Sequence, residues 1–172
     1  MDLDFMLGHL PRLLKATTLT IQLTFLSLFF GVFVGAFFAV LRTSQNKILQ
    51  LISYYYSYIF RGTPLLVQIF IIYFGFGQVE WIRESFLWVV FKEAYTCAIL
   101  AFTLNTGAYT SEIFRSAFQT INKGFIEAAD GLGMNKRSIF FKIKLPIAIK
   151  QSLPAYGNEM ILMLKGTSLA ST

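Results

Sequence analysis

Long apolar runs separated by short charged stretches dominate the pattern of the chain. The longest run, Ala16–Leu41, holds 26 residues without a charge and ends at Arg42. Crossing the hydrocarbon core of a bilayer takes about 20 mostly apolar helical residues, so this run predicts a membrane-spanning helix. Gly31 and Gly35 form a G-x-x-x-G pair within it, which permits close contact with a neighbouring helix. Chance spacing of two glycines is the alternative.

The second apolar region is interrupted near its middle. Ile48–Phe60 carries no charge, Arg61 follows, and the next stretch is uncharged again. Pro64 disfavours a helical conformation in the residue before it, so we expect the helix to kink or restart across Arg61–Pro64. On this interpretation Ile48–Phe60 is an entering or interfacial helix, and Thr63–Gly77 is the core of the second span.

Two further spans are predicted beyond a connection of mixed charge at 78–93, whose two tryptophans suit a membrane surface. The third span is Ala94–Ser111. The fourth, Ile147–Leu164, is the weakest, and a hydropathy scan can miss it. Its apolar pattern is interrupted by two charges, a proline and a glycine: Lys150, Pro154, Gly157 and Glu159. The pattern predicts an all-α, polytopic membrane protein with about four spans.

Composition and charge agree with a membrane protein. Hydrophobic residues make up 55% of the chain and charged residues only 14%, which is too few for an ordinary soluble surface. The net charge of +6 raises the question of nucleic acid, but the basic residues fall between apolar blocks rather than along a polar face. We therefore expect membrane lipid, and no nucleic acid, among the partners.

The basic residues also predict an orientation. Seven of the fifteen lie in one connection between the third and fourth spans: Arg115, Lys123, Lys136, Arg137, Lys142, Lys144 and Lys150. The positive-inside rule places that connection in the cytoplasm. Counting back along the chain, loop 42–50 is also cytoplasmic, whereas loop 78–93 and the N-terminal segment 1–15 are outside.

The chain lacks the residues of an enzyme or a cofactor site. A single cysteine and a single histidine exclude an internal disulfide and a metal cluster of those residues, and there is no Gly-rich phosphate loop ending in Lys-Ser/Thr. An intramembrane enzyme needs titratable groups that converge within the bilayer, and only Glu159 qualifies well. We expect no enzymatic activity and no bound cofactor, with a membrane scaffold or sensor as a further alternative to a transport subunit.

A spaced motif lies within the predicted cytoplasmic loop 116–146. Its defined positions read E-A-A-x3-G-x9-I-x-L-P, and they are Glu127, Ala128, Ala129, Gly133, Ile143, Leu145 and Pro146. At every defined position this motif resembles the cytoplasmic signature of ABC importer permeases. The resemblance implies a coupling element that docks on a separate ATPase subunit. The alternative is a basic amphipathic loop that rests on anionic headgroups.

The residues of this loop predict a helix–turn–helix. Asn122–Asp130 can form a short helix, whose two alanines give a small surface for close approach. Gly133 permits a sharp turn, and Asn135 can cap a second helix. Pro146 then restarts the chain into the fourth span.

Three further stretches resemble the polar amino acid subfamily of these permeases. Residues 61–68 read R-G-T-P-L-L-V-Q, residues 108–115 are close to A-Y-x-A-E-I-x-R, and the end of the chain carries N-E and K-G-T-S-L at 158–159 and 165–169. The resemblance spans 16–172. It implies a permease subunit that forms the translocation path for a glutamine-, histidine- or arginine-like amino acid in the bacterial cytoplasmic (inner) membrane.

The same resemblance implies partners and a longer chain. The implied partners are an ABC ATPase dimer that uses the ATP, a second permease copy or paralogue, and an extracytoplasmic amino-acid-binding protein. Such permeases usually continue past T-S-L with a fifth span, whereas this chain stops at Thr172. We expect either a fragment or frameshifted copy, or a remainder that is separately encoded.

The substrate path is predicted in the fourth span. A charge inside a membrane is costly, so Glu159 is a functional candidate. Transporters often bind substrate near the midplane at interrupted helices, and Pro154 with Gly157 suggests such an interruption. The candidate path residues are Asn158, Glu159, Thr167 and Ser168. The alternative is that Glu159 pairs structurally with Lys150 or Lys165.

Four other residues are candidates for a gate or an interface: Arg61, Pro64, Glu112 and Arg115. Glu112 and Arg115 are three residues apart and can pair on one helix face near its cytoplasmic end, where a structural ion pair is the favoured interpretation. Arg61 is either an interfacial anchor or part of a gate.

Overall fold

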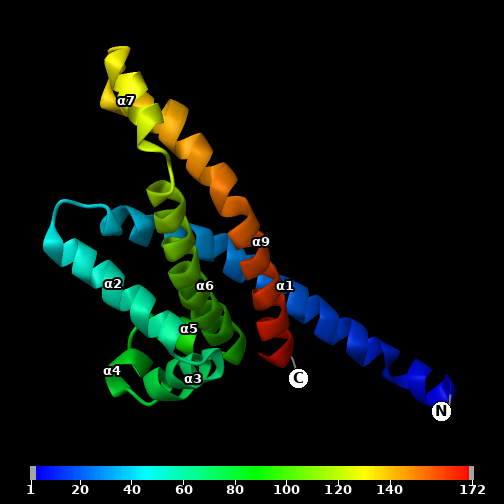
Figure 1. The fold of residues 1–172 in the computed structure, drawn as a ribbon. Coiled ribbons are helices and arrows are strands. Elements are labelled where there is room, and N and C mark those ends of the chain that lie inside the picture. Colours follow the sequence, from blue (N-terminus) through cyan, green and yellow to red (C-terminus); the bar gives the residue numbers. More distant parts are fainter. Residues whose placement is uncertain (1–2, 171–172) are drawn as a thin grey trace.

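The computed structural model describes the backbone of residues 3–170 and the side chains of residues 9–168. The described residues form helices and connections without a strand. The elements are α1 (Leu3–Arg42), α2 (Lys47–Gly62), α3 (Leu65–Phe70), η1 (Ile71–Gly75), α4 (Glu80–Arg83), α5 (Trp88–Phe91), α6 (Ala94–Gln119), α7 (Lys123–Gly131), α8 (Lys136–Ile139), η2 (Phe140–Lys144) and α9 (Leu145–Ala170). Figure 1 shows α7 projecting at one end of the bundle, while α3, α4 and α5 gather at the other end.

Helix α1 is longer than the sequence pattern predicts. It begins at Leu3, contains Pro11 and runs through residue 15 without a break, so the described part of segment 1–15 is helical and continuous with the predicted first span. At about 1.5 Å per residue its 40 residues extend for roughly 60 Å. Its N-terminal half therefore reaches beyond the other helices (Figure 1).

The predicted interruption of the second apolar region is confirmed. Helix α2 ends at Gly62, Thr63 and Pro64 are extended, and the axis bends by 108° before the segment Leu65–Gly75. The segment assigned as the core of the second span, Thr63–Gly77, is helical from Leu65 to Gly77. The longer piece is α2.

Only part of the bundle is apolar enough to cross a membrane by composition alone. Among the described helices, α1 meets this criterion over His9–Arg42. Helix α2 and the segment Leu65–Gly75 meet it only when the bent pair is counted as one span. Helices α6 and α9 have 26 residues each, which is long enough, but they are more polar. The weak hydropathy expected for the fourth segment is confirmed, and α6 shares it.

The polar residues of α6 lie inside the bundle, where α6 packs closely against α1. A Cβ added at Gly31 would lie 2.6 Å from Thr106 Cγ2, and one added at Gly35 would lie 2.6 Å from Thr110 Cβ. From the other side, a Cβ at Gly107 would lie 2.7 Å from Val34 Cγ1. The G-x-x-x-G pair therefore serves close helix packing, as one of its two interpretations predicts.

Helix α9 is continuous, which corrects two expectations. Pro154 and Gly157 lie inside it without interrupting it, since bilayer helices tolerate both residues. Pro146 also does not start a new helix, because the chain passes without a gap from α8 through η2 into α9. The wide π-turn of η2, in which the Leu145 N–H donates to the Phe140 carbonyl, leaves room for the proline ring that follows.

Candidate translocation path and coupling surface

Two buried amides hold the break between α2 and α3. Ending a helix leaves its last carbonyls without helical partners, and such groups are costly in a bilayer. Gln68 Nε2 donates to the carbonyls of Phe60 and Thr63 at 2.8 and 3.1 Å, and Asn105 Nδ2 donates to the Phe60 carbonyl at 3.0 Å. Asn105 also donates to Gln68 Oε1 at 3.2 Å. The sequence interpretation assigned neither amide a role, although both interrupt apolar runs.

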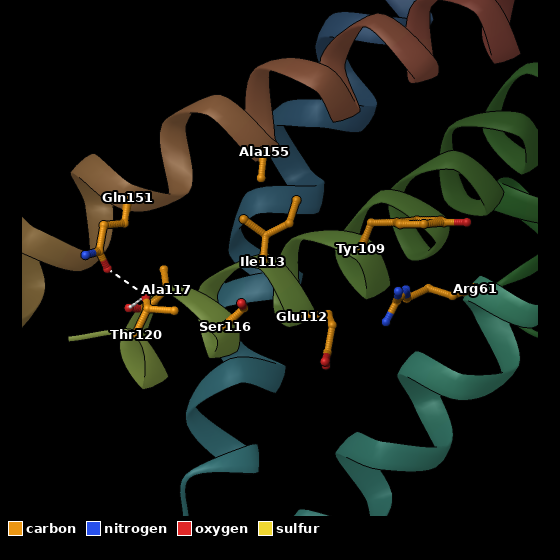
Figure 2. Close-up of a pocket in the computed structure, with 9 residues that line it drawn as sticks. All are labelled: Arg61, Tyr109, Glu112, Ile113, Ser116, Ala117, Thr120, Gln151 and Ala155. Carbon is orange, nitrogen blue, oxygen red and sulfur yellow. Dashed lines mark hydrogen bonds between the residues drawn. The ribbon is translucent and has the colours of Figure 1, made fainter. Parts of the chain in front are cut away.

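Arg61 lies immediately before this break, in the last turn of α2, and borders a cavity of about 340 Å³. Its guanidinium carbon is 5.3 Å from the centre of the Tyr109 ring. Figure 2 shows Arg61 extending from α2 toward α6, with α9 on the far side of the cavity. The lining residues are Arg61, Tyr109, Glu112, Ile113, Ser116, Ala117, Thr120, Gln151 and Ala155.

An ion pair and a hydrogen bond lie toward the end of α6 that precedes α7. Arg115 binds Glu112 through Nε, at 2.9 Å, and through Nη2, and it donates to Gln119 at 2.6 Å. The predicted structural pair is confirmed. Beyond it, Thr120 Oγ1 donates to Gln151 Oε1 at 2.8 Å and joins α6 to α9 (Figure 2).

Glu159 is buried on α9, one turn beyond the cavity wall. Residues 151, 155 and 159 are spaced by four and share one face of the helix, and the first two line the cavity. Only 6% of Glu159 is exposed. In the described part of the chain it forms no hydrogen bond and no ion pair, so the expected alternative of a pair with Lys150 or Lys165 is not found.

The other candidate path residues are dispersed along α9. Thr167 is fully buried and shares a hydrogen bond of 2.6 Å with Thr24 of α1, so it joins two helices instead of bordering the cavity. Asn158 is exposed beside Glu159. Ser168 is exposed further along and donates to the Lys165 carbonyl. The structure therefore brings Glu159 close to the cavity and separates it from Thr167 and Ser168.

The gate candidates lie on both sides of the break. Arg61 and Glu112 line the cavity, and Arg115 lies beside Glu112. Pro64 precedes the first turn of α3. A Cβ at Gly166 would lie 3.2 Å from Leu65 Cδ2, so the start of α3 packs against α9.

The coupling loop has the predicted helix–turn–helix. Asn122 caps α7 by accepting from the Gly124 N–H at 2.8 Å, and Asn135 caps α8 by accepting from the Ser138 N–H at 2.8 Å. Gly133 has φ of +74° and makes the turn between them. This left-handed conformation favours glycine, because a Cβ strains it.

The two alanines of the motif do not form one surface, which corrects the sequence interpretation. Ala129 is buried, with 2% of its surface exposed, whereas Ala128 and Glu127 are exposed. Leu132, which directly follows α7, is 82% exposed and adds to the accessible surface at the tip of the hairpin formed by α7 and α8. The remaining motif residues lie at the base of the hairpin: Ile143 and Leu145 are half-buried and Pro146 is exposed.

The base of the hairpin is packed onto the two long helices that carry the cavity. Ala117 of α6 and Ile121, two residues after that helix ends, form an apolar cluster with Ala148 of α9 and Ile126 of α7. The hairpin is therefore in packed contact with both long helices.

Residues 28–172, most of the chain, match the protein family described as the binding-protein-dependent transport system inner membrane component. The chain belongs to this family. It is therefore a permease subunit of an inner-membrane ABC transport system, a transport component and not an enzyme, and it works with a separate ATPase.

Relatives of the permease agree with this assignment. It is 49% identical to the nopaline transport system permease protein NocM of Agrobacterium fabrum, over 100% of this chain and 72% of the relative. It is 42% identical to the arginine ABC transporter permease protein ArtM of Haemophilus influenzae, over 95% of this chain and 72% of the relative. It also resembles the crystal structure of an amino acid ABC transporter with histidines, with a TM-score of 0.86 and 36% identity over 99% of this chain and 76% of that chain.

Proposed function

We propose that this permease forms the translocation path for a polar amino acid at the cavity beside the α2–α3 break. The observation that carries the proposal is Glu159, a buried carboxylate without a hydrogen-bond or ion-pair partner in the described part of the chain. An unpaired charge within a bilayer is costly, and the ammonium group of an amino acid supplies the missing cation. Asn158, the neighbouring polar residue, contributes from the exposed side of the same turn.

The position of the break supports this proposal. Transporters place substrate sites where helices are interrupted near the membrane midplane, and the described interruption lies at Gly62–Pro64 rather than in α9. Relatives named for nopaline and arginine transport indicate a substrate of the same chemical class, an amino acid or its derivative with polar groups.

We also propose that the tip of loop 116–146 docks on the ATPase. Glu127, Ala128 and Leu132 are exposed there, and Gly133 orients α7 relative to α8. The ATPase dimer binds and uses the ATP, while this chain binds no cofactor. The apolar cluster at the base of the hairpin then carries the closure of the ATPase into α6 and α9.

The remaining partners follow from the same assembly. A second permease copy or paralogue completes the path, an extracytoplasmic binding protein delivers the amino acid, and lipid surrounds the exposed phenylalanines of α1. The basic residues of 115–150 favour a cytoplasmic coupling loop and an N-terminus outside.

The replacement Glu159→Gln tests the path, because it keeps the shape of the side chain and removes its charge. A hydrogen bond to a charged group contributes about 1.5–3 kcal/mol, so amino acid uptake should become half-maximal at about ten- to a hundredfold higher concentration. Uptake is measured in proteoliposomes that contain the complete complex with its ATPase. The matched control is Glu84→Gln on the exposed connection. Unchanged uptake of every amino acid tested would remove Glu159 from the path.

A second pair of variants tests the coupling loop. Gly133→Ala adds a Cβ at a left-handed position, which costs about 1–2 kcal/mol, whereas Gly131→Ala adds one where φ is not positive and no atom lies within 4 Å. We expect the first variant to weaken co-purification of the ATPase and the second to retain it. Equal co-purification of both variants would contradict a role of this turn in docking.

A further inference from the structure

We infer that Arg61 binds the α-carboxylate of the transported amino acid, so that Arg61 and Glu159 recognise the two opposite charges of one zwitterion. The inference rests on the proposed role of Glu159 and adds the group that recognises the other end of the substrate. It predicts a site for ligands that carry a free carboxylate beside a cationic group.

Arg61 is a cation without an anionic partner. Its side chain is exposed to the cavity and lies over Tyr109, but it forms no ion pair in the described part of the chain. Arg115 differs, because Glu112 and Gln119 already accept its hydrogen bonds. Glu112 lines the same cavity as Arg61, but its ion pair is with Arg115, so the N–H donors of Arg61 are available to a ligand.

The backbone that carries Arg61 is held in place. The neighbouring Phe60 carbonyl accepts from both Gln68 and Asn105, and the Thr63 carbonyl accepts from Gln68. Ordered groups on both sides of the residue reduce the entropy lost when its side chain binds a ligand. The aromatic face of Tyr109 supports the guanidinium plane without using its N–H donors.

The chemistry of the two residues matches an amino acid. A guanidinium presents a planar fork of donors that fits a carboxylate in a bidentate manner. The cavity of about 340 Å³ lies within the size range of small-molecule sites. Ala155 of α9 lines the same cavity as Arg61, and Glu159 lies one helical turn further along the same face of α9, so a ligand that extends from Arg61 along α9 meets both charges.

A purely structural role for Arg61 predicts a different result. If Arg61 acts only through its charge, Arg61→Lys should keep the wild-type preference between a ligand and its decarboxylated counterpart, because the ammonium keeps that charge. If it binds the carboxylate, its loss should affect only ligands that have one. The comparison between a ligand and its decarboxylated counterpart therefore separates the two roles.

The experiment is competition binding to the purified permease–ATPase complex, with L-arginine and agmatine, the same molecule without its carboxylate, as probes. The wild-type complex should prefer L-arginine by about ten- to a hundredfold. Arg61→Gln should reduce that preference to within about threefold, and Arg61→Lys, which keeps the charge but loses the fork, should give an intermediate preference. Arg83→Gln is the matched control, because Arg83 also lies over an aromatic ring, that of Trp88, but does not line the cavity.

An unchanged preference in Arg61→Gln, equal weakening of both probes, or a wild-type preference in Arg61→Lys overturns the inference. If Arg61→Gln binds neither probe, the Arg61→Lys variant decides, and a wild-type preference or a complete loss of binding there also overturns it. The proposed function fails separately, when Glu159→Gln leaves the binding of both probes unchanged.

Discussion

Helix α6 packs against α1 through one face and borders a cavity through another, and the two faces are held by different forces. Toward α1 the contacts are made by glycines and threonines, and the hydroxyls of Thr106 and Thr110 are buried without hydrogen-bond partners in the described residues. Toward the cavity stand Tyr109 and Glu112, with hydrogen bonds and an ion pair around them.

This difference shows that the polarity of a membrane helix does not reveal the role of its faces. In lipid there is no hydrophobic force to join helices, so small residues stabilise contacts by close packing. Threonine serves there as a small residue, and its hydroxyl adds little. On the cavity side the same degree of polarity comes from groups that bind one another, or that remain free to bind a ligand.

The largest expected effect is at the packed face. In Gly35→Leu the new side chain meets Thr110 and the backbone carbonyl of Gly107, which would lie only 3.1 Å from the Cβ. We expect a loss of about 3 kcal/mol or more in the free energy of unfolding, measured by denaturant titration in mixed micelles. Gly157→Leu is the control, since no atom lies within 4 Å of its Cβ. Similar losses in both variants would break the comparison.

A smaller effect is expected on the cavity side, where hydrogen bonds hold the break. Gln68→Leu replaces the amide by an apolar side chain of similar size and leaves the Thr63 carbonyl without its amide donor. The cost should be about 1–3 kcal/mol, seen in the same titration and as faster hydrogen exchange near residue 63. Gln50→Leu on α2 removes an amide that donates to an exposed carbonyl, that of Ser44. If this control costs as much as Gln68→Leu, burial of the amide is not what stabilises the break.

The smallest effects distinguish two adjacent residues of α6. Thr110→Val removes a buried hydroxyl that has no partner in the described residues, so the stability should change by less than about 0.5 kcal/mol or rise. Ser111→Ala removes a hydroxyl that bonds Ser57 at 2.9 Å and the Ala108 carbonyl at 2.8 Å, and should cost about 1 kcal/mol. A larger loss in Thr110→Val than in Ser111→Ala would mean that the packed face depends on hydroxyl bonds after all.

Local features of the structure were predictable from the sequence. The break at Arg61–Pro64 follows from the proline itself, and the caps Asn122 and Asn135 bond to N–H groups two or three residues away. The turn at Gly133 likewise depends on one backbone conformation. Such features are determined by residues a few positions apart in the chain, so they can be read from the sequence alone.

The interpretation of α9 was less successful, for a physical reason. Pro154 and Gly157 suggested an interruption, but whether a bilayer helix bends at them depends on what packs beside it. Thr167 was expected near the substrate, whereas its bond to Thr24 joins residues 143 positions apart in the chain. Nothing in the local pattern of either residue indicates the other.

The sequence by itself determined the class of protein, the coupling loop between its predicted spans, the position of the break in the second apolar region, and the candidacy of Glu159. Only the tertiary structure decided which side chains face the cavity. It separated Glu159 from Lys150 and Lys165, placed Arg61 over Tyr109, and assigned Gln68 and Asn105 to the break. The reason is that helix periodicity fixes which residues share a face, whereas the partner of each face is selected by packing between segments far apart in the chain.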